Sequence, residues 1–364
     1  MSESGSEAVA VDVDVDEGVL DPWVADWIEA NPLFPIRDIY TYARGDISPF
    51  PVTRELANVY DDVVEGIPVR IYEGEGAPTG LVVYFHGGGF CIGSVSIMDN
   101  VARELAHACH ATVISVEYRL APEDPFPAGP DDCETVTRWA LANTERFGID
   151  PAKVMVAGGN FAALVALRLR GTVDTPLAGQ VLIYPGVDDG AEPSQSRKDF
   201  GGLAMSVEDM EWCWAAYSGG RDVSEGPLIA PLRAESHADL PPAIVILGGC
   251  DFLRDEGRAY AAKLRDSGVD VEEICYPGQI HGFINQMFPV AADAFDRIGT
   301  WAQARFAPSD RTPRRRRNRR ITRATDIAHT RGPGQSNQHV TTPHIWADVT
   351  SPHVLSRANW LTPR

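Results

Sequence analysis

Three consecutive glycines behind a histidine are the first residues in this sequence whose spacing indicates chemistry. The short apolar run 81–85 (LVVYF) is typical of a strand buried on both faces, and it ends at His86-Gly87-Gly88-Gly89. Glycines leave room for another molecule to approach the backbone N–H groups. A buried strand followed by this loop is typical of an oxyanion hole in acyl transfer. A tight turn without a ligand is the alternative, although a turn needs only one or two glycines. We therefore predict an oxyanion hole at Gly87, Gly88 and Gly89.

An aspartate and a histidine near the end of the chain form a second chemical pattern. Asp251 follows a predicted strand at 243–247, and His281 follows another predicted strand at 271–276. Side chains at the carboxyl ends of parallel strands converge on one edge of the sheet. A carboxylate that orients a histidine favours general-base chemistry. Taken alone, Asp251 is equally typical of a helix cap and His281 of a hydrogen-bonded loop histidine.

The elements that position these residues alternate between strand and helix along the chain. This alternation predicts an α/β fold with a parallel sheet and helices on both faces. Two short strands around a turn are expected between residues 60 and 72, and a helix from Asp21 that ends near Asn31. The further predicted strands are 81–85, 111–117, 153–157, 177–184, 243–247 and 271–276, and the further predicted helices are 100–109, 131–147, 160–170, 206–217, 255–267 and 290–306.

Four motifs in a fixed order give the sequence a family resemblance over about residues 20–307. They are His86–Phe90, Tyr118–Glu123, Asp251–Gly257 and Tyr276–Phe283. In these motifs the chain resembles the hormone-sensitive-lipase-like branch of the α/β-hydrolase esterases. The resemblance implies an α/β-hydrolase fold, with a mostly parallel central sheet and a small helical cap. It also implies carboxylic-ester hydrolysis without a cofactor or metal ion.

The resemblance also assigns roles to individual residues. It makes His281 the general base, Asp251 the residue that orients it, and Gly88 and Gly89 donors to the oxyanion. We expect the substrate pocket to be lined by His86, Phe90, Trp212 and Phe283.

The nucleophile that this family uses is missing from the sequence. The family carries a serine in G-D-S-A-G, on a strained turn between a strand and a helix. Residues 154–163 read VMVAGGNFAA, and the simplest alignment deletes Asp-Ser-Ala-Gly together with the serine. No G-x-S-x-G occurs anywhere in the chain. We predict that Asn160 occupies the place of the serine, and a carboxamide cannot form an acyl intermediate.

A deletion of this length is compatible with the fold. Four residues rotate a helix only about 40° beyond one full turn, so the apolar face of the helix stays nearly aligned. Other candidate nucleophiles lie near the motifs, but the sequence places none of them within reach of His281. They are Ser94, Ser96, Cys91 and Cys250.

Three functional hypotheses follow from these observations. The first is a carboxylesterase by descent, with the His-Asp dyad and oxyanion loop kept and activity impaired by the missing serine. The second is a non-catalytic relative that binds a small hydrophobic ligand or a partner. The third is a damaged gene product.

The domain organisation is expected to have three parts. We predict a disordered acidic leader at 1–17, a hydrolase domain at 18–307, and a disordered arginine-rich tail at 308–364. Cap elements are expected at about 18–50 and 190–225. Alternating Val and Asp in the leader also mimic a strand. The foreign composition of the tail indicates a frameshift or readthrough, and a nucleic-acid-binding arm is the functional alternative.

Composition restricts the partners and the compartment. Of the net charge of -19, the tail contributes +8 through 11 Arg against 3 Asp, so the first 307 residues carry -27. Such an acidic, lysine-poor surface resembles proteins of salt-rich cytoplasm and argues against nucleic acid as a partner of the domain. Six scattered cysteines, the absence of a signal peptide and the absence of a membrane-length apolar run predict a cytoplasmic protein. The expected partner is a small ester or hydrophobic molecule, with a homo-oligomer possible.

Overall fold

The computed structural model describes residues 18–45, 50–190, 193–222 and 228–307. The chain divides into two units, residues 1–308 and 309–364, and the second unit lies outside the described residues. The predicted leader at 1–17 and the predicted tail at 308–364 also lie outside them, so both stay predictions. Within the described ranges, no helix is both long and apolar enough to cross a membrane.

An 8-stranded sheet organises the first unit. Its strand order is β1-β2-β4-β3-β5-β6-β7-β8, and every pairing from β4 to β8 is parallel. Strand β2 is antiparallel to both of its neighbours, β1 and β4. The strands are β1 (Asn58–Val64), β2 (Ile67–Glu73), β3 (Gly80–Phe85), β4 (Ala111–Val116), β5 (Val154–Gly158), β6 (Gly179–Ile183), β7 (Ala243–Gly248) and β8 (Val271–Tyr276).

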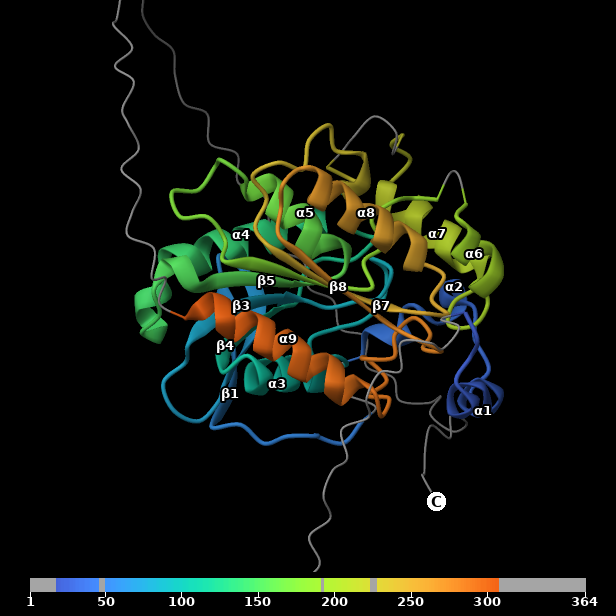
Figure 1. Cartoon of the computed structure of the whole chain (residues 1–364), viewed down its shortest axis with the longest axis horizontal. Coiled ribbons are helices and arrows are strands. Elements are labelled where there is room, and N and C mark those ends of the chain that lie inside the picture. Colours follow the sequence, from blue (N-terminus) through green and yellow to red (C-terminus); the bar gives the residue numbers. More distant parts are fainter. Residues whose placement is uncertain (1–17, 46–49, 191–192, 223–227, 308–364) are drawn as a thin grey trace, which may run out of the picture. The chain divides into compact units, whose positions relative to one another are not determined.

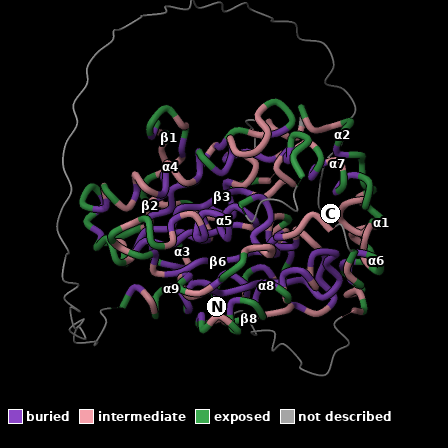
Figure 2. Tube along the Cα trace, turned by 90° about the horizontal axis from the view of Figure 1, so that it is seen from above, coloured by how far each residue is buried: buried purple, intermediate pink, exposed green. Residues whose placement is uncertain are grey.

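The central strands are buried on both faces because helices cover the sheet on each side. The helices are α1 (Pro22–Ala30), α2 (Ile36–Ile39), α3 (Asp99–Ala108), α4 (Ala128–Ala142), α5 (Asn160–Leu169), α6 (Gln195–Phe200), α7 (Val207–Ser218), α8 (Arg254–Asp266) and α9 (Ala291–Phe306). Figure 1 shows α4, α5 and α8 on one face of the sheet and α3 and α9 on the other. Figure 2 shows the burial that results, with β3 and β6 within the buried interior of the unit.

Alternate side chains of each central strand enter different layers of the core. In β3, Val83 and Phe85 pack in the layer that holds α4, α5 and α8. Val82 and Tyr84 pack in the other layer, with α3 and α9. This period of two explains why the run is apolar throughout, as expected for a strand covered on both faces.

Two short helical segments from distant parts of the chain meet near the carboxyl edge of the sheet. The Ile36 N–H at the start of α2 donates to Asp209 Oδ1 in α7 (2.9 Å), across 173 residues of sequence. The rings of Tyr40 and Trp212 lie 5.4 Å apart at the same contact. Helix α6 is joined to α8 by the buried ion pair Arg197–Glu256 (2.8 Å). These contacts hold α2, α6 and α7 against the sheet domain.

The α/β-hydrolase fold expected from the sequence is confirmed. The sequence locates β3 to β8 within two residues of their observed ends. Strands β3 to β7 are buried along their whole length, which explains their apolar runs, whereas β8 is only partly buried. The sheet is mostly parallel, and β1 and β2 form its antiparallel edge.

Candidate active site

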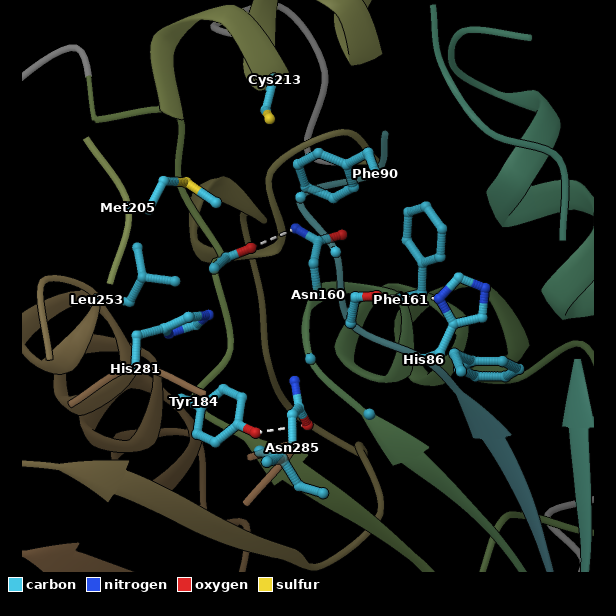
Figure 3. A pocket seen from close by; sticks show the side chains of 18 of the residues that line it. His86, Phe90, Asn160, Phe161, Tyr184, Met205, Cys213, Leu253, His281 and Asn285 are labelled. Atoms are coloured by element: carbon cyan, nitrogen blue, oxygen red, sulfur yellow. Dashed lines mark hydrogen bonds between the residues drawn. The ribbon is translucent and has the colours of Figure 1, made fainter. Parts of the chain in front are cut away.

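A cavity of about 110 Å³ lies at the carboxyl ends of the central strands. It brings together the triple-glycine loop after β3, the turn from β5 to α5, the segment after β6, and loops that follow β7 and β8 (Figure 3). Helix α7 closes the opposite wall. The lining residues are Tyr84, Phe85, His86, Gly87, Gly88, Gly89, Phe90, Tyr118, Gly158, Gly159, Asn160, Phe161, Ile183, Tyr184, Gly186, Met205, Met210, Cys213, Trp214, Phe252, Leu253, His281 and Asn285.

The triple-glycine loop presents its backbone to this cavity. Gly88 has φ +137°, and a Cβ added there would overlap the backbone carbonyl of Ile92. Gly89 has φ +55° and lies against Cys213 of α7. The N–H groups of Gly88 and Gly89 donate to no acceptor within the described part of the chain. Glycine is therefore required at Gly88, and both N–H groups are available to a ligand.

His86 begins the loop but is buried as a neutral ring. The Tyr118 hydroxyl donates to the His86 carbonyl (2.6 Å), and the two rings stack at 4.2 Å. Burial lowers the pKa of His86 to about 4. His86 lines the cavity, and its packing against Tyr118 supports the loop.

The structure brings His281 and Asp251 together across the ends of β7 and β8. His281 Nδ1 lies 3.0 Å from Asp251 Oδ2, and Asp251 Oδ1 accepts the Leu253 N–H (2.7 Å). The Asp251 side chain is fully buried, whereas the His281 side chain is 23% exposed and lines the cavity. An imidazole held at Nδ1 by a carboxylate presents Nε2 for proton transfer, which is the geometry of a general base.

The turn between β5 and α5 places an asparagine on the cavity. Strand β5 ends at Gly158, whose φ of +145° leaves no room for a side chain, because a Cβ would lie 2.5 Å from the Phe85 carbonyl oxygen. Gly159 follows, and helix α5 begins at Asn160. The strand-to-helix turn therefore passes directly from Gly158 and Gly159 into α5, and Asn160 lines the cavity.

The Asn160 carboxamide is fixed by one hydrogen bond. Its Nδ2 donates to the Gly186 carbonyl (2.6 Å), as Figure 3 shows. Its Oδ1 is buried and accepts no hydrogen bond from the described residues. A side chain held in this way offers no nucleophile, because an amide nitrogen is not basic.

Aromatic side chains form the wall between the glycine loop and α7. Phe90 lines the cavity and stacks on Tyr217 at 4.0 Å, with Trp214 at 5.0 Å and Phe161 at 5.6 Å. Trp212, which was expected in the substrate pocket, does not line this cavity. Helical geometry turns Trp212 away, so that it contacts Tyr40 of the 18–50 segment, while Trp214 two residues later faces the cavity.

Phe283 does not line the cavity either. It is fully buried and packs against Tyr276 (5.3 Å) and Tyr184 (5.9 Å) beneath the cavity. Tyr184 and Asn285 do line the cavity, although neither was predicted from the sequence. Their positions, one residue after a strand and four residues after His281, were the available clues.

Among the described residues, no three His, Cys, Asp or Glu side chains lie close enough together to hold a metal ion.

Comparison with known proteins agrees with this geometry. Residues 82–285 match the family model of the α/β-hydrolase fold. A carboxylesterase of Mycobacterium tuberculosis, NlhH, is 39% identical over 251 residues, which cover 65% of this chain and 78% of that protein. The chain belongs to the hormone-sensitive-lipase-like branch of the α/β-hydrolase family.

Other members of this family show the same similarity. An arylesterase of Saccharolobus solfataricus is 36% identical over 242 residues, covering 65% of this chain and 78% of the arylesterase. The solved structure of a Pyrobaculum calidifontis esterase superimposes with a TM-score of 0.71 at 32% identity, over 78% of this chain and 98% of the esterase. Descent from carboxylesterase-type hydrolases is therefore shown for this chain.

Proposed function

We propose that this chain binds carboxylic esters in the cavity and hydrolyses them with water, far more slowly than a serine esterase does. The observation that carries the proposal is the position of Asn160. It begins α5 on the cavity wall, where the family places its serine, while the His281–Asp251 pair and the glycine loop line the same cavity.

The proposed reaction uses His281 as the only base. His281 Nε2 takes a proton from a water molecule as its oxygen attacks the ester carbonyl. The resulting oxyanion accepts hydrogen bonds from the N–H groups of Gly88 and Gly89, which have no other described acceptor. The intermediate collapses to the carboxylic acid, and the imidazolium returns the proton to the leaving alkoxide. Asp251 keeps the imidazole oriented throughout.

The missing serine determines the rate in this scheme. A serine at the turn is held beside its base, whereas a water molecule must be ordered for every turnover. Hydrolases that lack their triad keep some rate over water from binding and oxyanion stabilisation. We therefore place the activity of this chain about 10³-fold or more below that of an intact triad.

The test is hydrolysis of p-nitrophenyl butyrate by the unmodified chain, with and without a serine-directed phosphonate. We expect slow turnover that the phosphonate does not inhibit and that His281→Ala reduces further. Rapid turnover blocked by the phosphonate would show that a hydroxyl nucleophile exists and would refute the proposal.

A second candidate is a binding protein without turnover. The presence of a cavity of about 110 Å³ favours it over a damaged product, because a collapsed turn would have filled this space. A ligand that binds while His281→Ala leaves ester hydrolysis unchanged would favour this candidate.

We also propose that the protein acts in the cytoplasm on a small molecule and not on nucleic acid. The support is the charge of -27 over residues 1–307, together with six cysteines that form no disulfide. A homo-oligomer stays a prediction, which sedimentation would test.

A further inference from the structure

Asn285 is a polar cavity residue to which the scheme above gives no role. It lies in the loop after His281, and its Oδ1 accepts the Tyr184 hydroxyl at 2.7 Å. Burial raises the pKa of Tyr184 well above its usual value, so the hydroxyl keeps its proton. This hydrogen bond fixes the carboxamide and sets the direction of its Nδ2.

Tyr184 is itself held in an unusual conformation. It follows β6 with φ +32°, a region that non-glycine residues rarely adopt. Its ring meets the His281 ring edge-on at 4.7 Å and is buried. Such backbone strain persists only where the surrounding structure holds it, and it is concentrated at functional sites. Tyr184 thus links the orientation of Asn285 to that of His281.

The Asn285 Nδ2 faces the glycine loop. It lies 3.4 Å from the position that a Cβ on Gly87 would occupy. Figure 3 shows this nitrogen pointing away from Tyr184, toward the part of the cavity where Asn160 lies. No acceptor for it occurs among the described residues. A fixed N–H donor beside the oxyanion loop is therefore open to a ligand.

We propose that Asn285 Nδ2 donates a hydrogen bond to the carbonyl oxygen of the bound ligand and makes the cavity selective for carbonyl compounds over hydrocarbons of the same shape. The inference rests on the proposed function only in taking the ligand to be a carbonyl compound. It requires no turnover. Asn285 is a binding residue, and Tyr184 is the positioning residue that orients it.

The experiment compares two probes that do not react, butyrophenone and butylbenzene, which differ by a carbonyl in place of a methylene. Ligand-observed NMR titration gives a Kd for each with the full chain. We expect the ketone to bind more tightly, by about threefold to tenfold, as one net hydrogen bond to a neutral group supplies. In Asn285→Ala the ratio of the two Kd values should fall clearly below that of the unmodified chain, because only the glycine N–H groups then remain as donors.

Two further variants separate hydrogen bonding from packing. Asn285→Asp keeps an acceptor for Tyr184 but replaces Nδ2 with an oxygen, so it should favour butylbenzene. Tyr184→Phe frees the carboxamide and should reduce the preference only in part. Gln286→Ala, at the exposed neighbouring residue that does not line the cavity, should leave the ratio unchanged.

These outcomes test the role of Asn285 separately from the proposed hydrolysis. A ketone preference of unchanged size in Asn285→Ala would overturn it, because the glycine N–H groups alone would then account for binding of the carbonyl. Failure of the full chain to bind either probe would overturn it as well. Circular dichroism confirms that each variant is folded. The hydrolysis assay is read independently, since rapid turnover refutes the water mechanism and leaves the Kd ratio valid.

Discussion

The two sides of the cavity differ in what they retain of an esterase. On one side, His281 and Asp251 lie 3.0 Å apart, and Gly88 and Gly89 expose their N–H groups. On the other side, the β5–α5 turn ends in Asn160, whose carboxamide is bound to Gly186. Under the proposed function, the first side moves a proton and stabilises charge, whereas Asn160 on the second side supplies no nucleophile.

This difference shows that the parts of a catalytic site have separate structural supports. The dyad depends on loops after β7 and β8, and the oxyanion loop depends on β3. Asn160 depends only on the turn after β5. The His281–Asp251 pair and the glycine loop are therefore positioned by other segments than this turn.

The largest effect is expected when a serine is supplied on the Asn160 side of the cavity. Insertion of Asp-Ser-Ala-Gly between Gly158 and Gly159 should raise kcat/KM for p-nitrophenyl butyrate by about 10³-fold or more, since it supplies a positioned hydroxyl. The same insertion should create labelling by a serine-directed phosphonate. Insertion of Asp-Ala-Ala-Gly is the control of matched length. Equal activity of the two insertions would mean that the hydroxyl is not what the chain lacks.

A second prediction concerns how closely the turn between β5 and α5 is packed. Gly158→Ala should lower the free energy of unfolding by about 2 to 3 kcal/mol, because φ is +145° and the new Cβ would meet the Phe85 carbonyl oxygen at 2.5 Å. Denaturant unfolding measures this loss. Gly159→Ala is the matched control, since its Cβ would come no closer than 3.6 Å to a neighbour. Equal losses at both positions would contradict this account of the turn.

A third prediction uses the pH dependence of stability to test the burial of His86, which precedes the glycine loop. Burial holds the pKa of His86 at about 4, below the 6.5 of an exposed histidine. Between these values the unfolded chain binds the proton and the folded chain does not, so stability falls as the pH falls. The loss attributable to His86 should be about 2 kcal/mol from pH 6.5 to 5.

His86→Gln should make the dependence of unfolding free energy on pH shallower over this range. The slope, and not the absolute stability, is the quantity to compare with the unmodified chain. An unchanged slope would mean that His86 takes up a proton in the folded state.

The smallest expected effect concerns Asn160. Asn160→Ser supplies a hydroxyl without restoring the turn, so kcat/KM should rise by about tenfold at most. Phe161 follows at once and packs against Tyr118 (4.9 Å), where the family carries a small residue. Asn160→Ala is the control. Activity equal to that of the serine insertion would show that the length of the turn does not matter.

Much of this fold was predictable because strands buried on both faces are apolar throughout. The run 81–85 located β3 to within one residue. The motifs around Asp251 and His281 follow β7 and β8, as the sequence predicted. The antiparallel pairing of β2 with β4 was not predicted, because the alternating pattern of a short strand does not indicate which strand it pairs with.

The cavity wall was less predictable than the fold. Trp212 and Trp214 differ by two helical positions, and only the approach of α2 decides which of them faces the cavity. Tyr184 and Asn285 form a hydrogen bond across 101 residues, which no local pattern records. Phe283 is a large aromatic residue close to His281 in the sequence, which is typical of a pocket wall. In the structure, Tyr276 packs closely against it and leaves no space for a ligand.

Phe90 has a consequence for the thermodynamics of ligand binding. A loop of three glycines would normally sample many conformations, and ordering it on binding would oppose association. Here Phe90 lies between Tyr217, Trp214 and Phe161, so folding of the unit already orders the loop. A ligand therefore meets a rigid receptor and loses little affinity to the entropy of the loop. Under the proposed function, this order favours binding of carbonyl compounds whatever the rate of hydrolysis.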